Sequence, residues 1–466
     1  MVSAKDIRFL VCALNVAFTL SLCLLGVPAQ ASQSTIKPFF IFKCNSSTNV
    51  CPNGQQPTSL IQSADGNLYG TTGFGGNSSQ AEGTVFKLSP RRQLTTIFTF
   101  LGDQNGRSPT SLLEGNDGNL YGTTNFGGAN NAGVVFKLSK SGTIQVLHNF
   151  CSLAACADGN GPFNLVLGSD GNLYGATSVN FSPGTLFRVT REGSYTLLHT
   201  FNAQVDGPQA LGMTLASDGN IYGTTQGGSG FPTVLFQLTP AGRVNVLHAW
   251  RYPTFPVSPA TQVSDGTLRG VVTEITGGAQ PAMFSIQLSG SGYQEIPLFI
   301  PPSRSEVRYM TEASDGNFWG TQGFAILSFT FGGTELQQLP FKGNNASVQM
   351  RLLQASSGTL VGFASAGTRD EQNPGEIFVI QPKLPAPKPA FVNFKPARGK
   401  VGAKVVIQGV HFVGATAVTF NGVKASFRAL NTGDIVATVP GGATTGSISV
   451  TNAGGTTAST NSFVVE

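Results

Sequence analysis

Histidine suits acid–base chemistry near neutral pH, and three of the four histidines in the chain recur at one place in a repeated pattern. His148, His199 and His248 each lie near the end of a segment with strand character. The corresponding position holds Phe98 in the first copy and Phe40 in an N-terminal strand. A position that exchanges histidine with phenylalanine is typical of packing. We therefore predict a structural role for these histidines and no catalytic residue among them.

Aspartates recur in the unit Asp-Gly-Asn, where the carboxylate predicts a cap on a tight hairpin and the glycine supplies positive φ. One copy replaces the aspartate with Ser357, which can cap a turn but is no carboxylate. Asp103 and Asp158 begin two longer polar loops, but a calcium loop needs further oxygen ligands, including a later bidentate acid. Asx turns therefore explain them better, and we expect neither a metal nor a cofactor.

Aromatic and amide side chains gather in the longer predicted loops, and this combination suits neutral sugars. The phenylalanines in register at the start of equivalent loops are Phe74, Phe126 and Phe324. The charged cluster in another such loop is Arg369, Asp370 and Glu371. These six residues are the predicted ligand-binding candidates; the alternative is that the phenylalanines fill space beneath their loops.

A glycosidase would need two carboxylates about 5–10 Å apart over the same face. The acids outside the repeat pattern that could supply them are Glu274, Glu312, Asp370 and Glu371. The sequence contains neither an H-E-x-x-H motif nor a glycine-rich phosphate loop ending in Lys-Ser or Lys-Thr. An enzyme is therefore the alternative hypothesis rather than the first one.

Composition indicates the elements that position these residues. Of 466 residues, 59 are glycine and only 11% are charged, and Phe (34) far outnumbers Tyr (8) and Trp (2). An average protein has about 25% charged residues. This composition argues against coiled coils, helical bundles and charge-rich disorder, and it favours many short strands joined by glycine turns.

A short motif recurs seven times at intervals of 42 to 53 residues, and each unit contains four β-branched or aromatic runs. The motif positions are Asp65, Asp117, Asp170, Asp218, Asp265, Asp315 and Ser357. Four strands in about 40–50 residues are the size of one propeller blade. The last copy lacks its fourth strand, whereas residues 36–42 resemble one that has no copy of its own. We therefore predict an all-β fold, a seven-bladed β-propeller over residues 32–384, closed by strand 36–42.

The amino-acid sequence of the repeat resembles that of a known protein family. The pattern Asp-Gly-Asn-Leu-Tyr-Gly-Thr-Thr, then Gly-Gly, Gly-x-Val-Phe-Lys-Leu and Leu-His-x-Phe resembles the GloVer tandem repeat of bacterial secreted "choice-of-anchor" proteins. The resemblance covers roughly residues 35–381. It implies an exported or surface-attached protein, and it implies no defined reaction.

A proline-rich segment, 381–389, indicates a domain boundary, and the rest of the chain alternates like a small β-sandwich. The runs Gly402–Phe412, Val418–Val423 and Gly446–Thr451 resemble an IPT/TIG immunoglobulin-like domain, which we assign to residues 385–466. In bacterial surface proteins, the resemblance implies a spacer or attachment unit. From residue 385 there are seven basic and two acidic residues, which would suit an acidic surface; scattered lysines on a solvated domain are the alternative.

The first 31 residues read as a signal peptide, with Lys5 and Arg8 before an apolar run and Ala29-Gln30-Ala31 as the cleavage pattern. An uncleaved membrane anchor is the alternative. After cleavage no transmembrane segment is expected. The remaining cysteines form two close pairs that predict local disulfides rather than a zinc site: Cys44 with Cys51, and Cys151 with Cys156.

Together these features predict a secreted or cell-surface protein that binds or adheres. The expected partner is extracellular polysaccharide or a cell-envelope component, met through the long loops. Nucleic acid is not expected, because the large domain has no basic stripe. The alternatives are a carbohydrate-active lyase or hydrolase on the same scaffold and a purely structural envelope protein.

Overall fold

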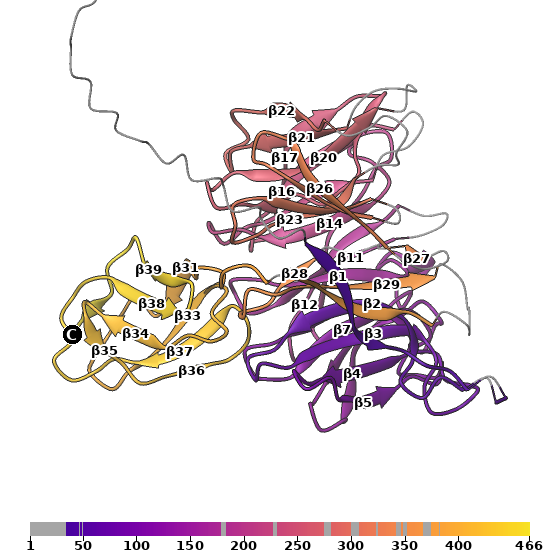
Figure 1. Cartoon of the computed structure of the whole chain (residues 1–466), viewed down its shortest axis with the longest axis horizontal. Helices are drawn as coiled ribbons and strands as arrows, with labels where there is room; N and C mark the ends of the chain where they lie inside the picture. Colours follow the sequence, from indigo (N-terminus) through magenta and orange to yellow (C-terminus); the bar gives the residue numbers. More distant parts are fainter. Residues whose placement is uncertain are drawn as a thin grey trace, which may run out of the picture. The chain divides into compact units, whose positions relative to one another are not determined.

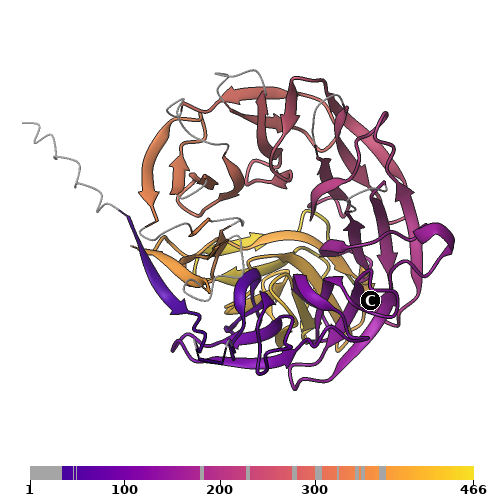
Figure 2. The same ribbon diagram turned by 90° about the vertical axis from the view of Figure 1, so that its right-hand side faces the viewer.

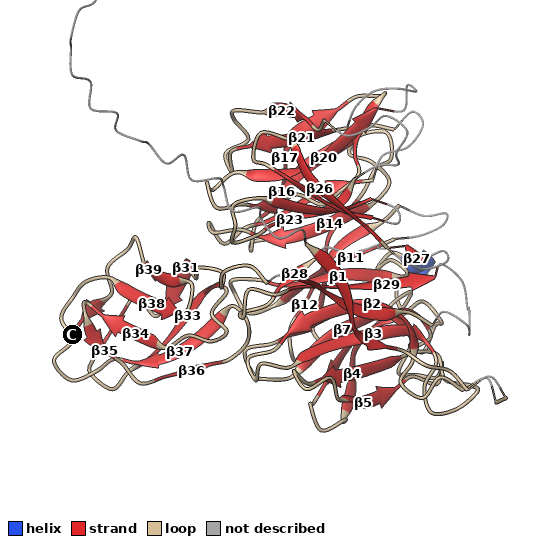
Figure 3. Ribbon diagram, in the orientation of Figure 1, coloured by secondary structure: helices blue, strands red, loops and turns tan. Residues whose placement is uncertain are grey.

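The computed structural model is all-β, and its one helical element is the 3-10 turn η1 (Ala154–Cys156) in the part of the chain that it describes (Figures 1 and 3). The described residues are 34–45, 47–48, 50–178, 183–226, 231–274, 281–299, 307–322, 325–341, 346–347, 352–366, 374–381 and 383–466. The all-β prediction is confirmed. The predicted signal peptide, 1–31, lies outside the described residues.

Six antiparallel sheets follow one another between residues 55 and 340, and we name them sheets I to VI in chain order. Sheet I contains β2 (Gln55–Gln62), β3 (Leu68–Phe74), β4 (Thr84–Leu88) and β5 (Leu94–Thr99). Sheet II contains β6 (Arg107–Glu114), β7 (Leu120–Phe126), β8 (Val134–Leu138) and β9 (Ile144–Asn149). Sheet III contains β10 (Pro162–Leu167), β11 (Leu173–Thr177), β12 (Thr185–Val189) and β13 (Tyr195–Thr200). Sheet IV contains β14 (Ala210–Leu215), β15 (Ile221–Thr225), β16 (Thr233–Leu238) and β17 (Val244–Trp250). Sheet V contains β18 (Thr254–Pro256), β19 (Thr261–Gln262), β20 (Leu268–Glu274), β21 (Ala282–Ile286) and β22 (Gln294–Pro297). Sheet VI contains β23 (Arg308–Glu312), β24 (Phe318–Gln322), β25 (Ala325–Phe329) and β26 (Glu335–Pro340).

A further sheet, sheet VII, joins the two ends of this region. It contains β1 (Thr35–Ile41), β27 (Ala346–Ser347), β28 (Leu353–Gln354), β29 (Leu360–Ala366) and β30 (Glu376–Gln381). β1 pairs antiparallel with β30, with Ile36 opposite Ile380 and Ile41 opposite Glu376. The N-terminal strand therefore covers the edge that β30 would otherwise leave open to a second chain.

Hydrophobic clusters connect the sheets in a circle. One cluster joins each consecutive pair of sheets from I to VII; for example, Tyr69 of sheet I lies with Leu120 of sheet II. The circle closes in a cluster that contains Phe42 and Ile377 beside sheet I residues such as Phe86. Figure 2 shows these sheets following one another around a ring. The structure describes seven such sheets, sheets I to VII, and seven blades were predicted. We interpret these sheets as the blades of a β-propeller.

A glycine in the second strand of each sheet explains why the repeat contains Tyr-Gly. Gly122 lies opposite Phe136 in the register of β7 and β8, and the phenylalanine ring covers the glycine. The same pairing of glycine with phenylalanine recurs in five other sheets. Sheet VI pairs Gly320 with Leu327 instead. Glycine is needed here because a Cβ would occupy the space of the ring.

The tight turn after the first strand of each sheet confirms the predicted cap. The amide of Asn119 donates to Asp117 Oδ1 at 3.1 Å, and the Tyr121 hydroxyl donates to the other carboxylate oxygen at 2.8 Å. The same pair of bonds recurs at Asp65, Asp170 and Asp218. The carboxylates that recur in the sequence therefore hold hairpins together.

Glutamine or glutamate side chains fasten these turns to the neighbouring sheet. Gln354 Oε1 accepts from the amide of Ser314 at 3.0 Å, and Gln62 Oε1 accepts from the amide of Ser356 at 2.8 Å. Equivalent bonds come from Glu114, Gln262 and Glu312. Each bond satisfies a turn amide across a sheet boundary, and the one from Gln62 crosses the boundary where the ring closes.

The rest of the chain is a β-sandwich, which we name the C-terminal sandwich (390–465). One sheet has the strand order β31 (Ala390–Lys395), β33 (Lys404–Val410), β37 (Asp434–Thr438) and β36 (Phe427–Ala429). The other has the order β35 (Val423–Lys424), β34 (Ala417–Phe420), β38 (Ile448–Asn452) and β39 (Gly455–Ala458), and β32 (Arg398–Gly399) pairs in parallel with β40 (Val464–Val465). Its core gathers residues of both sheets, such as Ile407 and Val450.

Candidate functional site

The two ends of the strands in sheets I to VII differ. One end has short turns, such as 63–67, which a cap and a bond from Glu114 hold, and 89–93, where the Ser89 hydroxyl accepts from the Gln93 amide. The other end carries the longer connections, such as 75–83, 100–106 and 150–161. We name this second end the loop face. Loops on a rigid scaffold are where binding residues concentrate, so the loop face is the candidate site.

Neighbouring loops on this face are hydrogen-bonded to each other. The amide of Glu82, after β3, donates to the carbonyl oxygen of Phe100, after β5, at 2.8 Å. The amide of Gly128 donates to the carbonyl oxygen of Asp103 at 3.0 Å. The loop face is therefore a connected layer rather than a set of separate loops.

Two disulfides clamp segments of the loop face, and both were predicted. Cys44 is bonded to Cys51, and Cys151 to Cys156. The amide of Gly76, in the first long loop, donates to the carbonyl oxygen of Cys51 at 2.9 Å. The first disulfide segment thus holds the loop that follows Phe74.

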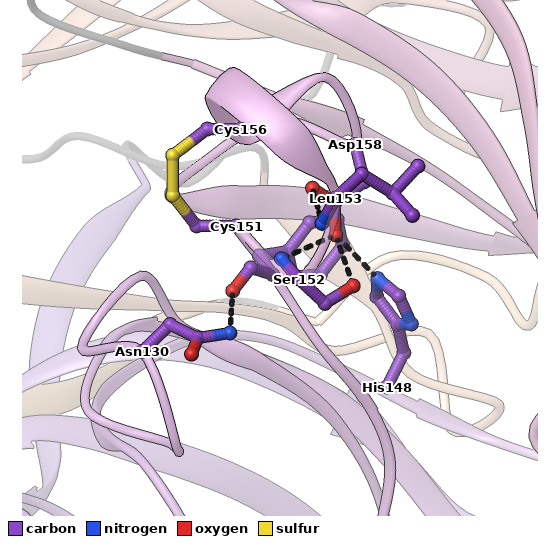
Figure 4. Close-up of a disulfide and its surroundings, with 8 residues drawn as sticks. Asn130, His148, Cys151, Ser152, Leu153, Cys156 and Asp158 are labelled. Carbon is purple, nitrogen blue, oxygen red and sulfur yellow. Dashed lines mark hydrogen bonds and ion pairs between the residues drawn. A yellow bond between two sulfur atoms is a disulfide. The ribbon is translucent and has the colours of Figure 1, made fainter.

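Asp158 organises the second disulfide segment (Figure 4). Its Oδ2 accepts from the Ser152 hydroxyl at 2.7 Å and from the Ser152 amide at 3.0 Å, and its Oδ1 accepts from the Leu153 amide at 3.2 Å. His148 Nε2 lies 3.1 Å from the same Oδ2. An Asx turn was predicted at both Asp103 and Asp158. It is present at Asp103, whose carboxylate accepts from the amide of Asn105. Asp158 instead caps the disulfide loop.

A serine, a histidine and an aspartate meet here, but not in the order that nucleophilic catalysis needs. Asp158 lies between Ser152 and His148, so the imidazole cannot take the serine proton. Burial alone would raise the pKa of Asp158, but hydrogen bonds from Ser152 and Leu153 lower it. The cluster is therefore a structural anchor for the loop.

The recurring histidines make packing contacts, and His148 and His199 also have polar partners. The ring of His148 stacks on Tyr195 of the next sheet at 4.0 Å between centroids, and His248 stacks on Tyr293 at 3.7 Å. His199 Nε2 lies 2.7 Å from Asp206 Oδ2. The sequence did not reveal these aspartate partners, because they lie ten and seven residues after their histidines in loops of unequal length.

Stability should depend on pH through His148. Burial lowers the pKa of His148, outweighing the opposing effect of Asp158, so the folded state binds its proton less tightly than the unfolded chain. The free energy of unfolding should therefore fall as the pH drops below the ordinary histidine pKa of about 6.5. In thermal melts between pH 7 and pH 5, His148→Phe should lose less stability than the native protein.

Tyr195→Phe is the matched control for this prediction. It removes the hydroxyl that donates to the carbonyl oxygen of Asp158 at 3.0 Å. Burial raises the pKa of Tyr195 far above this range, so the control should shift stability equally at every pH from 5 to 7. An unchanged pH slope in His148→Phe would contradict the role given to the histidine.

The structure describes two of the six predicted ligand-binding candidates. Phe74 and Phe126 end the second strands of sheets I and II, and in each case a threonine two residues earlier donates to the phenylalanine carbonyl oxygen at 3.0 Å. They are therefore in register, as predicted. The other four, Phe324, Arg369, Asp370 and Glu371, lie outside the described residues.

Phe126 has the more open environment of the two. Its side chain is 41% exposed, whereas Phe74 is half-buried. The guanidinium carbon of Arg107, which pairs with Phe126 in the strand register, lies 5.3 Å from the ring centroid. The side chains of Arg107 and Glu82 both lie against Gly102, where a Cβ would be 3.6 Å from each of them. Sequence reasoning did not include Arg107 or Glu82.

The loop face also exposes apolar side chains that the sequence prediction missed. Among the described residues, each loop between consecutive sheets from I to VI carries one exposed large hydrophobic residue: Leu101, Leu153, Val205, Tyr252 and Phe299. Each of them lies one to four positions after a buried residue that ends or directly follows the fourth strand. Exposed apolar groups gathered on one face are typical of interaction sites.

The acids named for a catalytic alternative do not converge where they are described. Glu274 ends the second strand of sheet V, at the loop face, and the Thr254 hydroxyl donates to it at 3.4 Å. Glu312 ends the first strand of sheet VI, at the short-turn end, and accepts from the amide of Ser264 at 2.6 Å. The described residues contain no cluster of three or more histidine, cysteine or acidic side chains suited to a metal.

Comparison with known families supports both resemblances. A family model described as the Gloeobacter/Verrucomicrobia repeat matches residues 56–284, and an IPT/TIG domain model matches residues 389–465. The comparison with curated proteins finds no match. In the described part of the chain, no helix has the length and apolarity needed to span a membrane.

Several solved structures are distantly similar. The extracellular domain of a hybrid two-component system from B. thetaiotaomicron has 12% identity and a TM-score of 0.49, over 93% of this chain and 59% of that one. A fungal alcohol oxidase of the AA5 family in complex with copper has 11% identity and a TM-score of 0.46, over 92% and 98%. A gluconolactonase from Xanthomonas campestris has 15% identity and a TM-score of 0.35, over 59% and 86%. These likenesses are too distant to argue for a function.

Proposed function

We propose that this chain is an exported, non-enzymatic binding protein that recognises polysaccharide through its loop face. It carries the Gloeobacter/Verrucomicrobia repeat and a C-terminal IPT/TIG domain. The proposal includes cleavage of the signal peptide after residue 31. It also includes a propeller over residues 32–384 and an IPT/TIG domain over residues 385–466. The two disulfides fit an oxidising compartment outside the cytosol.

The observation that carries the proposal is the contrast between the two ends of the sheets. The short-turn end is closed by hydrogen bonds within and between sheets, and its carboxylates are occupied there. The loop face instead presents exposed apolar and aromatic side chains on loops that disulfides and interloop hydrogen bonds hold in place. A preorganised surface of this kind loses little entropy on binding.

Phe126 and Arg107 are the residues on which we expect a sugar to bind. An exposed aromatic ring offers an apolar face for a pyranose, and a guanidinium beside it supplies hydrogen-bond donors for hydroxyl groups. Glu82, whose side chain lies against the same glycine, Gly102, as that of Arg107, supplies acceptors. The low charge of the whole chain, 11%, suits a neutral polymer.

The test is a panel of neutral bacterial and plant polysaccharides, assayed for binding and for product release by the purified protein. Phe126→Ala should weaken binding about tenfold or more, because stacked aromatic contacts dominate such surfaces. Leu336→Ala removes a somewhat more exposed apolar group from the outer strand β26 and should leave affinity within about twofold.

Product release would instead favour the carbohydrate-active enzyme alternative, with Glu274 as the one of the four acids named for it that the structure describes at the loop face. Equal affinities for both variants and the native protein would contradict the proposed site. Absence of binding across the panel would leave the structural envelope protein as the better account.

A further inference from the structure

The C-terminal sandwich has one sheet whose outer face is unusually basic. Phe394, Val405 and Ile435 of this sheet point into the core. Side chains alternate along a strand, so their neighbours Lys395, Val406 and Val436 point outward. The register places Lys395 opposite Val406, Val406 opposite Val436, and Val436 opposite Arg428.

This cross-strand row begins and ends with a cation. Lys395 and Arg428 are exposed, and the two valines between them are half-buried. The row crosses the four strands β31, β33, β37 and β36, labelled in Figure 1. Three strand separations of ~4.8 Å place the two ends about 14 Å apart.

Three more cations lie beside the row or on the segment next to it in the chain. Lys404 lies beside it on the same face, where its ammonium donates to the Thr438 hydroxyl at 2.6 Å. Arg398 and Lys400 are exposed on the segment that joins β31 to β33. We name these five residues the basic face: Lys395, Arg398, Lys400, Lys404 and Arg428. None of them forms an ion pair within the described part of the chain.

The sandwich has few carboxylates to balance this charge. Asp434 lies one row away on the same side of the sheet but is only 4% exposed, and Asn431 Nδ2 donates to it at 2.9 Å. Burial raises the pKa of Asp434, despite hydrogen bonds from Asn431 and Gln408. Glu466 lies at the Arg398 end, where its amide donates to the Gly399 carbonyl oxygen at 3.2 Å. The centre of the basic face therefore has no exposed carboxylate of its own.

We propose that the basic face binds an acidic polysaccharide, as a second surface distinct from the loop face. A sheet with cations spread over about 14 Å suits an extended polymer that lies across the strands and carries repeated carboxylates. An anionic membrane is a poorer match. Binding at a lipid interface uses Trp, Phe and Leu, whereas the exposed large apolar residues of this sandwich are valines, namely Val401, Val410 and Val464.

The test uses the purified full chain with polygalacturonate, with dextran as the neutral polymer, and with vesicles of phosphatidylglycerol. Polygalacturonate should bind saturably, and raising the salt from about 50 to 200 mM should weaken it severalfold through screening. Any binding of dextran should be unchanged when charges of the basic face are removed. Lys395→Gln combined with Arg428→Gln should weaken polygalacturonate binding about tenfold or more.

Lys388→Gln combined with Lys424→Gln is the matched control. It removes the same two charges from exposed positions before β31 and on the other sheet, so it should change affinity by no more than about twofold. If both double variants lost affinity for polygalacturonate equally, binding would depend only on the net charge of the protein, and the proposal would be overturned. Binding to the vesicles alone, or no binding to polygalacturonate, would also overturn it. Phe126→Ala should leave this binding intact, so the two surfaces can fail separately.

Discussion

Replacing Phe42 by alanine is expected to lower the free energy of unfolding by about 3–5 kcal/mol, the usual cost of removing a buried phenylalanine. Phe42 is 1% exposed, and its ring lies 5.2 Å from Phe40 and 5.6 Å from Phe86. Because Phe86 belongs to sheet I, this contact joins the N-terminal segment to the sheet on the far side of the closure. Thermal and denaturant unfolding measure the loss.

Ile41→Ala is the matched control, since Ile41 precedes Phe42 directly and is 52% exposed. It should change the free energy of unfolding by no more than about 0.5 kcal/mol. Similar small shifts in both variants would mean that the ring does not depend on this closing contact.

The second large effect is expected at Gly122. An alanine Cβ there would overlap Phe136 Cζ and lie 2.5 Å from the carbonyl oxygen of Ser111. Overpacking of this kind costs about 2–3 kcal/mol, because the ring and the strand must both move. Unfolding measurements on Gly122→Ala should show this loss.

A rescue variant and a control sharpen this prediction. Sheet VI carries leucine opposite its glycine, so adding Phe136→Leu to Gly122→Ala should recover part of the stability. Gly441→Ala adds a Cβ with nothing within 4 Å and should be nearly neutral. No recovery in the double variant would show that the phenylalanine ring is not the cause.

The repeated parts of the fold were predictable because local chemistry recurs with them. Asp117 and Gly118 mark a capped turn, and the incomplete last copy pointed to residues 36–42 as the missing strand, which lies beside β30. The cysteine spacing predicted both disulfides. The bonds from Gln354 and Gln62 were not predictable in this way, because they join sheets whose relative placement no local pattern specifies.

The candidate site was less predictable for a related reason. Phe74 and Phe126 were found because they keep the repeat register. Arg107 begins the first strand of sheet II, nineteen positions before Phe126, and only the strand pairing brings the two together. The apolar loop residues, such as Leu101 and Tyr252, vary in type and in distance from the preceding strand, so no fixed spacing identified them.

Hydrogen–deuterium exchange of the full chain, with and without a bound neutral polysaccharide, tests the central claim most directly. The account predicts slower exchange in peptides that cover the loops 100–106 and 127–133, which flank Arg107 and Phe126. Peptides that cover the turns 89–93 and 139–143, at the opposite end of the same sheets, should be unchanged. Protection at the turns with none at the loops would contradict recognition through the loop face.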